Sequence, residues 1–309
     1  MSARYAYLGP EGTFAEAALR SIPQAADAQR LPCVSVADSL DAVRRGDVLA
    51  ALVPLENSIE GSVSETLDEL ASGDELQIVR EVLLTVSFAL LARPGTTLDA
   101  ISTVTTMPHA EAQVRGWLRR TLPDAKFIAA ASTAGGASAV AAGEADAAVA
   151  APLAAERYQL EVLADDIADN PGAVTRFVLV SRPVPPPPVT GADKTTVVAY
   201  IADDHAGALL ELLTEFAVRG VNLTRIESRP TGVGLGRYCF SIDAEGHVEQ
   251  QRVGEALAAM KRLCADVRFL GSYPAAARTP IAEKSGTSDG DFAESKAWVE
   301  SLRAGTERR

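Results

Sequence analysis

The chain has 309 residues, of which 47% are apolar and 23% charged, and its formal net charge at pH 7 is -12. At roughly 150 residues per domain, this length predicts about two domains, and the apolar share is too high for a disordered chain. The acidic balance argues against a general affinity for nucleic acid or for an anionic membrane. A local arginine can still bind a small anion, so an anionic substrate is not excluded.

The cysteines and the apolar runs give further limits. The three cysteines are widely spaced, without a Cys-x-x-Cys pair or a Cys/His cluster, so the sequence predicts neither a disulfide framework nor a metal site. The first residues enter a strand-like run at once and have no signal-peptide core. The longest strongly apolar run, residues 82–92, is shorter than the roughly 20 residues of a membrane span. We expect a soluble cytoplasmic protein.

A proline-rich segment divides the chain. Residues 183–188 hold five prolines in six positions, a composition that favours an extended spacer over a helix or a central strand. We predict a first domain over 1–182, a linker over 183–193, a second domain over 194–274 and a tail over 275–309. The end of the tail has apolar residues at helical spacing, Phe292, Val299 and Leu302 with Trp298 beside them. A short docking helix and a frayed tail both fit this pattern.

Strand-like and helix-like segments alternate through the first domain. In chain order we predict a strand at 4–8, a helix from 13 to 20, a helix at 38–45 capped by Asp38, a strand at 50–55 and a helix at 63–71 capped by Ser62. There follow an extended stretch at 76–93, a strand at 102–107, a helix at 109–122, a strand at 126–131, an alanine-rich helix, and strands at 147–151 and 176–181. The alternation predicts an α/β fold with mostly parallel sheet. Residues 84–160 are typical of a second α/β unit inserted into the first, which gives two lobes with a cleft for a small ligand.

The second domain follows a βαββαβ pattern. Its predicted elements are a strand at 195–201, a helix at 207–218, strands at 221–226 and 237–243, a helix at 248–264 and a strand at 268–273. This order predicts a ferredoxin-like sandwich with helices on one face of a single sheet. The edge or the open face would then be available for pairing with another copy. The glycines at 232, 234 and 236 do not have dinucleotide-fingerprint spacing and predict a flexible hairpin.

Polar residues follow several predicted strands of the first domain, where an α/β sheet usually binds its ligand. Thr13 lies in the Gly9–Phe14 turn, and Asn57 and Ser58 follow the strand at 50–55. Glycines and free amides at a helix start can hold an anion. The structural alternatives are an ordinary strand–helix turn and a helix cap.

Three later positions carry similar signals. Ser132 and Thr133 open the alanine-rich helix, where hydroxyls and free amides favour an anion or hydroxyl ligand. Arg176, between Thr175 and an apolar strand, suits a bidentate contact to a carboxylate. The alternatives are a simple helix cap, a solvated threonine and a structural arginine. His109 follows Pro108 at a strand end, and a lone histidine is more often structural.

Two motifs belong to the second domain. Gly207-Ala208-Leu209-Leu210 begins a helix, and its small residues leave room for a ligand. Glu227-Ser228-Arg229-Pro230 follows a strand and turns. Packing is the alternative for each motif taken alone.

Together and in this order, these motifs resemble the monofunctional prephenate dehydratase family, in which a dehydratase domain precedes an ACT regulatory domain. The resemblance covers residues 4–274 and rests on six motifs in register. It implies a two-lobed, periplasmic-binding-protein-like catalytic domain followed by a βαββαβ ferredoxin-like ACT domain. It also implies decarboxylative dehydration of prephenate to phenylpyruvate without a cofactor, with phenylalanine as an allosteric effector and a homodimer or homotetramer formed through both domains.

The resemblance also implies roles for single residues. Thr175 is the essential catalytic threonine of the Thr-Arg-Phe motif. The implied substrate-binding residues are Arg176, Asn57, Ser58, Ser132, Thr133, Thr13, Phe177 and His109, with Gln113 beside His109. The implied effector-binding residues are Gly207, Ala208, Leu209, Leu210, Asn222, Leu223, Glu227, Ser228, Arg229 and Pro230. The glutamine that family members can carry in the helix after Ser132 has no counterpart at 138–140.

Two other functions stay open at this point. A cytosolic sensor with a two-lobed solute-binding fold would bind a ligand without catalysis. An arogenate dehydratase would perform the same chemistry on the transaminated substrate. Turnover of prephenate and of arogenate, measured side by side, separates the three.

Overall fold

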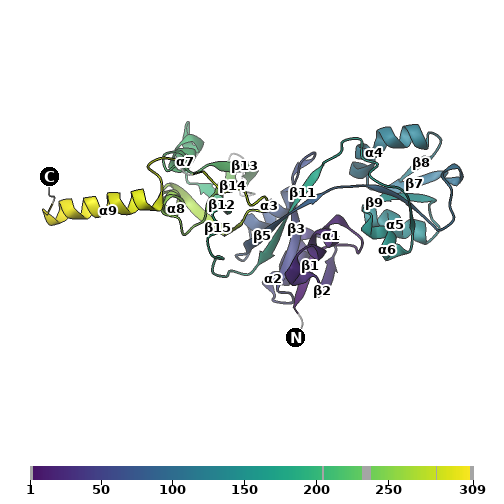
Figure 1. Cartoon of the computed structure of the whole chain (residues 1–309), viewed down its shortest axis with the longest axis horizontal. Helices are drawn as coiled ribbons and strands as arrows, with labels where there is room; N and C mark the ends of the chain where they lie inside the picture. Colours follow the sequence, from purple (N-terminus) through teal and green to yellow (C-terminus); the bar gives the residue numbers. More distant parts are fainter. Residues whose placement is uncertain (1–2, 204, 232–237, 283, 307–309) are drawn as a thin grey trace. The chain divides into compact units, whose positions relative to one another are not determined.

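The computed structural model describes residues 3–203, 205–231, 238–282 and 284–306 (Figure 1). The chain forms two compact units. The first consists of Met1–Glu69 with Val82–Arg182, and the second of Leu70–Glu81 with Pro183–Arg309. The predicted glycine hairpin at 232–236 lies outside the described residues. In the described ranges, no helix has both the length and the apolar character needed to cross a membrane.

The first lobe of the first unit is built on a six-stranded sheet. Its order is β2-β1-β3-β11-β5, with β4 paired to β3. The strands are β1 (Arg4–Leu8), β2 (Gln29–Cys33), β3 (Ala50–Asn57), β4 (Gly61–Ser62), β5 (Gln77–Thr85) and β11 (Val174–Ser181), and the helices are α1 (Phe14–Arg20), α2 (Val36–Arg44) and α3 (Ser64–Ala71). Strand β1 runs parallel to β2 and β3, whereas β11 runs antiparallel to β3.

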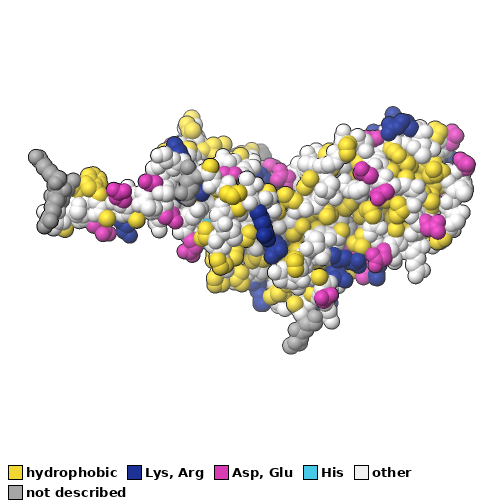
Figure 2. Space-filling model, in the orientation of Figure 1, with side chains coloured by type: hydrophobic (Ala, Val, Ile, Leu, Met, Phe, Trp, Pro, Cys, Tyr) yellow, Lys and Arg dark blue, Asp and Glu magenta, His cyan; other side chains and the backbone are white. Residues whose placement is uncertain are grey.

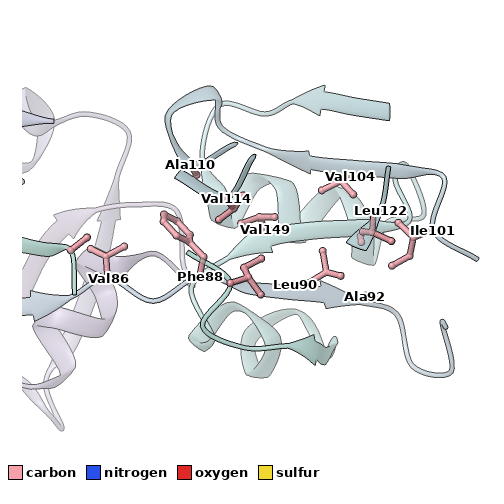
Figure 3. Packing of buried hydrophobic residues seen from close by; sticks show 13 residues of the cluster. Val86, Phe88, Leu90, Ala92, Ile101, Val104, Ala110, Val114, Leu122 and Val149 are labelled. Atoms are coloured by element: carbon pink, nitrogen blue, oxygen red, sulfur yellow. The ribbon is translucent and has the colours of Figure 1, made fainter. Parts of the chain in front are cut away.

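The second lobe has a five-stranded sheet in the order β10-β6-β9-β7-β8. Its strands are β6 (Ala89–Ala92), β7 (Thr103–Thr106), β8 (Lys126–Ala129), β9 (Ala147–Ala150) and β10 (Glu161–Ala164), and its helices are α4 (Pro108–Thr121), α5 (Thr133–Ala141) and α6 (Leu153–Tyr158). Figure 3 shows Phe88, Leu90, Val104, Val114 and Val149 in the buried core that joins α4 to this sheet. Apolar side chains at successive turns of α4 thus have a sheet to cover.

The predicted insertion is confirmed. The chain leaves the first sheet after β5, builds the whole second sheet, and returns through β10 to β11. The expectation of mostly parallel sheets is wrong, because both sheets are mixed. The strands that connect the lobes run against their neighbours: β11 is antiparallel to β3, and β6 is antiparallel to β9 and β10.

The predicted cap of α2 is also wrong. Helix α2 begins earlier than predicted, and its cap is Ser35, whose hydroxyl accepts a hydrogen bond from the Asp38 amide at 3.0 Å. Ser62 lies in β4, two residues before α3 begins. Ser35 and Asp38 are both residue types that cap helices well, so local sequence does not select between them.

The second unit carries the predicted βαββαβ sandwich. Its sheet has the order β13-β14-β12-β15. The elements are β12 (Asp193–Ile201), α7 (Ala208–Ala217), β13 (Leu223–Pro230), β14 (Tyr238–Glu245), α8 (Gln251–Leu263) and β15 (Cys264–Pro274). Val197, Phe216, Ile242, Val253 and Met260 are among the residues that form the core between the sheet and its two helices. A sixteen-residue helix, α9 (Asp289–Ala304), follows.

The sequence predicts that the sheet face opposite the helices is available for pairing. In the structure, part of this face is covered. Residues 70–81 lie against it: the Lys194 ammonium is 3.1 Å from the Glu81 carboxylate, and the Arg268 guanidinium donates to the Ser72 carbonyl at 2.9 Å. The Tyr200 hydroxyl also donates to the Ala71 carbonyl. The end of α3, the turn after it and the first part of β5 therefore cover part of the open face. The edge strand β13 keeps alternate residues exposed.

Candidate functional site

Thr175 and Asn57 meet where two antiparallel strands of the first lobe are in register. Thr175 on β11 is paired with Asn57, the last residue of β3. The Asn57 side-chain amide donates a hydrogen bond to the Thr175 hydroxyl oxygen at 2.8 Å. The Thr175 side chain is largely buried, with 9% of the residue exposed. Strand pairing between positions 118 residues apart thus builds the central contact of the site.

The orientation of the Asn57 amide follows from its other contacts. Its carbonyl oxygen accepts hydrogen bonds from the backbone amides of Ile59 at 2.8 Å and Glu60 at 3.1 Å. Because an amide oxygen only accepts and an amide nitrogen only donates, the NH2 group is the end that faces Thr175. The Thr175 oxygen is therefore an acceptor toward Asn57, and its own proton points elsewhere. Among the residues that the structure describes, that proton has no acceptor, so it is available for a bound molecule.

Ser58 braces the loop that follows Asn57. The Ser58 amide donates to the Val174 carbonyl at 2.9 Å, and the Val174 amide donates to the Ser58 hydroxyl at 3.0 Å. These two bonds continue the β3–β11 pairing by one step beyond Asn57. The structure therefore gives Ser58 a role in holding Thr175 and Asn57 together.

Arg176 lies one position after Thr175 and is paired with Glu56. Successive residues of a strand point to opposite faces, so Arg176 and Glu56 share the face opposite to Thr175 and Asn57. Arg176 is 6% exposed, and its guanidinium is 3.9 Å from the Glu56 carboxylate. Phe177 is buried in the sheet. This placement is compatible with the structural alternative for Arg176 and with a packing role for Phe177.

The turn that contains Thr13 is closed by its own side chains. The Thr13 hydroxyl accepts from the Glu16 amide at 3.4 Å and donates to the Leu8 carbonyl at 3.1 Å, as a helix cap does. The buried Glu16 carboxylate accepts from the Gly12 amide at 2.7 Å and pairs with Arg20 at 2.7 Å. Two amides of this helix start are therefore already occupied.

Ser132 caps α5 and precedes the buried Thr133. The Ser132 hydroxyl accepts from the Gly135 amide at 2.9 Å, and Gly136 packs against the Thr105 carbonyl of β7. A side chain at 136 would press on that strand, which explains the glycines of this helix start. In the described residues, no hydrogen bond joins Ser132 or Thr133 to Asn57 or Thr175.

His109 and Gln113 connect α4 of the second lobe to the loop after β3. The His109 Nδ1 lies 3.1 Å from the Glu60 carboxylate, and the Gln113 amide donates to the same carboxylate at 3.5 Å. The sequence did not single out Glu60, although it lies in the motif that contains Asn57. An acidic side chain close to the polar residues Asn57 and Ser58 was the signal that could have identified Glu60. Glu60 thus joins the loop that holds Asn57 to the opposite lobe.

A second connection between the lobes was also missed. The Arg157 guanidinium of α6 pairs with the Glu11 carboxylate, and the Tyr158 hydroxyl donates to the Glu11 carbonyl at 2.9 Å. Burial raises the pKa of Tyr158. The rings of Phe14 and Phe88 meet edge to face at 5.4 Å. Nothing in the sequence pairs these residues, since they are up to 147 positions apart.

In the second unit, the two predicted effector motifs occupy different places. Gly207 caps α7 with a left-handed backbone (φ 97°), which favours glycine. Residues 207–210 line a cavity of about 410 Å³ with Asp203, His205, Tyr238 and Phe240. Glu227, Ser228, Arg229 and Pro230 lie on the edge strand β13, where Ser228 and Pro230 are exposed. Asn222 immediately precedes that strand and Leu223 begins it. The Asn222 carbonyl accepts a hydrogen bond from the Glu245 amide.

In the described part of the chain, no group of three or more His, Cys, Asp or Glu side chains is arranged to hold an ion. The arrangement at Thr175 is that of an oriented neutral hydrogen-bond donor. Such a donor stabilises a negative charge that develops on a bound molecule.

Comparisons with known proteins agree with this architecture. A family model described as prephenate dehydratase matches residues 5–185, and one described as ACT domain matches residues 196–262. A relative named prephenate dehydratase from Mycolicibacterium vanbaalenii is 50% identical and covers 97% of this chain and 98% of its own. A solved prephenate dehydratase from Arthrobacter aurescens, in complex with L-Phe, is 51% identical with a TM-score of 0.94, and the match covers 98% of this chain and 100% of that one. The solved structure of GqqA, described as a novel type of quorum quenching acylase, is 33% identical with a TM-score of 0.79, covering 88% of this chain and 98% of that one.

Proposed function

The chain belongs to the prephenate dehydratase family, and we propose that it converts prephenate to phenylpyruvate, carbon dioxide and water under control by phenylalanine. This reaction makes it a carbon–oxygen lyase. The observation that carries the proposal is the Asn57–Thr175 pair, which presents an oriented hydroxyl donor without a charge of its own.

The reaction needs a donor for its leaving group. The bond between the ring and its carboxylate breaks, carbon dioxide leaves, and the electron pair moves through the ring. The carbon–oxygen bond at the opposite ring position then breaks, and the departing hydroxide takes up one proton to become water. The product ring is aromatic, so the substrate itself accepts the electrons and the step needs no external oxidant or reductant.

Thr175 is the proposed donor to the departing oxygen. Asn57 already donates to the Thr175 oxygen, so the free proton of the hydroxyl is directed at the substrate. An alcohol is a weak acid, but a hydrogen bond that strengthens as negative charge develops lowers the barrier without full proton transfer. Asn57 is then a positioning residue and Thr175 the catalytic one.

The other predicted substrate contacts remain part of the proposal. Arg176 would bind a substrate carboxylate, and Ser132, Thr133, Thr13 and His109 would line the cleft. Ser58 and Phe177 would hold the strands β3 and β11 in place, Ser58 through its hydrogen bonds to Val174 and Phe177 through its buried side chain. Each of these roles competes with a contact inside the protein, which for Arg176 is Glu56 and for His109 is Glu60.

The regulatory half of the proposal concerns the second unit. L-Phe is bound in the solved relative from Arthrobacter aurescens, and we assign phenylalanine as the effector here too. The α7 start lines a cavity that also includes Tyr238 and Phe240, and the Glu227–Pro230 motif lies on the edge strand that pairs with these two residues. We propose that the effector site combines the α7 start of one copy of the chain with the exposed edge strand of another. The homo-oligomer and the cytoplasmic location belong to this proposal.

An assay of the purified full chain with prephenate and with arogenate tests the function. Phenylpyruvate and carbon dioxide from prephenate support it. Turnover of arogenate alone would change the substrate, and binding without product would make the protein a sensor. The likeness to an acylase makes an N-acylated amide a necessary parallel substrate. Cleavage of that amide without prephenate turnover would replace the proposal.

A further inference from the structure

The last helix, α9, has a cap at each end but is not buried by the residues that the structure describes. Ser288 and Asp291 form a capping box at the start of α9, and Gly305 ends it with a left-handed backbone (φ 65°). The Gln251 amide of α8 donates to Asp289 at 2.8 Å, which ties the first turn to the sandwich. None of its sixteen residues is buried, and Figure 1 shows α9 projecting beyond α8. A helix of this length is marginal in water when isolated.

One side of α9 carries a regular stripe. Phe292, Ser295, Val299 and Leu302 are separated by three, four and three residues, which is the a/d spacing of a coiled-coil seam. Val299 is 37% and Leu302 43% exposed. A groove of about 680 Å³ runs beside the helix, lined by Phe292, Ser295 and Val299 together with Gln251 and Glu255 of α8. Figure 2 shows apolar, acidic and basic side chains together on the surface of α9.

The flanking residues select a partner and a direction. Counting Phe292 as position a, Lys296 and Arg303 are both e positions and Trp298 is a g position. An antiparallel pair would set Lys296 against Arg303 of the other helix, two like charges. A parallel pair brings Trp298 beside Arg303 of the other helix, a favourable cation–π arrangement, and Asp291 beside Lys296. The stripe is therefore complementary to itself in parallel orientation.

We propose that α9 pairs in parallel with α9 of a second copy of this chain along Phe292, Ser295, Val299 and Leu302. The stripe from Phe292 to Leu302 spans roughly 15 Å at 1.5 Å per residue. Two heptads are too short to hold a dimer alone, but linked to another contact between the same copies they act at high effective concentration. The match to the solved Arthrobacter aurescens chain leaves about 2% of this chain unaligned. This is fewer residues than α9 contains, so at least part of α9 has a counterpart in that chain.

Cysteine cross-linking of the full chain tests the seam. In a background with Cys33→Ser and Cys264→Ser, Ser295→Cys places a thiol on the stripe, and Ala297→Cys places one on the opposite side of the same helix. Mild oxidation should link Ser295→Cys into dimers at least about tenfold more than Ala297→Cys. Leu302→Cys, in the last turn, should link to itself as well, because only the parallel orientation brings these positions together.

Sedimentation equilibrium provides a second measurement. Val299→Glu should raise the dissociation constant between copies about tenfold or more, because it places a charge in the seam. The matched control Ala297→Glu should leave the constant unchanged. Equal cross-linking at 295 and 297 would overturn the pairing. So would a Val299→Glu protein that loses thermal stability with unchanged association, since the stripe would then be covered by its own chain.

Discussion

Replacing Asn57 with aspartate reverses the hydrogen bond that orients Thr175. Asn57→Asp keeps one oxygen to accept the Ile59 and Glu60 amides at 2.8 and 3.1 Å. The second oxygen replaces the NH2 group that donates to Thr175 at 2.8 Å. A carboxylate can only accept, so the Thr175 proton turns toward the new carboxylate and away from the substrate. The side chain is nearly the same size, which makes the change electronic and not steric.

The expected loss follows from what the donor contributes. Assistance to a leaving group by a positioned side chain accelerates a reaction by roughly 10²- to 10⁴-fold, or about 3 to 5 kcal/mol of transition-state stabilisation. Asn57→Asp should lose kcat in this range, about as much as Thr175→Ala, while Thr175→Ser retains more. The Asn57→Asp/Thr175→Ala double variant should be no slower than the worse single variant, because both remove the same interaction.

Stability measurements separate this effect from misfolding. Asn57→Asp should keep its thermal midpoint, whereas Asn57→Ala leaves two amides without their acceptor and should cost about 1 kcal/mol. Prephenate turnover is followed by phenylpyruvate formation in a stopped assay. If Asn57→Asp folds and retains kcat within about threefold of the parent chain, the oriented-donor argument fails. Additive losses in the double variant would count against it equally.

Three further changes have defined outcomes. Arg176→Lys should raise the Michaelis constant for prephenate several-fold, since an ammonium cannot make a bidentate contact; a lowered thermal midpoint with an unchanged Michaelis constant would instead make Arg176 a structural partner of Glu56. Hydrogen bonds from Thr103 and the Ser102 amide lower the pKa of Asp146. The stabilisation by this carboxylate is therefore complete above the ordinary carboxyl pKa of about 3.9 and is lost as the pH falls through the lower folded value. Asp146→Asn should reduce the acid dependence of unfolding below about pH 4, and an unchanged pH profile would exclude the effect. Ser228→Ala and Gly207→Val should blunt the response to phenylalanine with near-normal basal turnover, and calorimetry that finds equal phenylalanine affinity in residues 1–182 and in the full chain would exclude the assigned effector site.

Local patterns were sufficient for most of the fold. The apolar runs at 50–55 and 147–151 became buried strands, and the βαββαβ order of the second unit followed from strand and helix periodicities. Strand β2 was missed because its residues, Gln29–Cys33, include a proline and several polar side chains. Its place at the sheet edge beside β1 tolerates such a composition. Edge strands carry a weak apolar signal, so they are the elements that periodicity finds least well.

Some features of the site were also predictable from neighbouring residues, whereas others depend on residues far apart in the sequence. Ser132 as a helix start and the turn at Thr13 were readable from a few residues, and the structure uses both as caps. The direction of the Asn57 amide depends on strand register between β3 and β11 and on the turn at Ile59 and Glu60. Register across 118 residues has no local signature. Sequence reasoning could therefore name the pair but not say which atom donates to which.

The covered sheet face has a consequence for the proposed regulation. Residues 70–81 lie on the open face of the ACT sheet through Glu81, Ser72 and Ala71, so two copies cannot pair through that part of the face. The exposed positions of β13, including Ser228, and the stripe on α9 remain. If the effector site takes its helix start from one copy and its strand from another, phenylalanine binds the paired arrangement and not the single chain. Binding and pairing are then one linked equilibrium, so the ligand stabilises the pair to the extent that its affinity for the two arrangements differs.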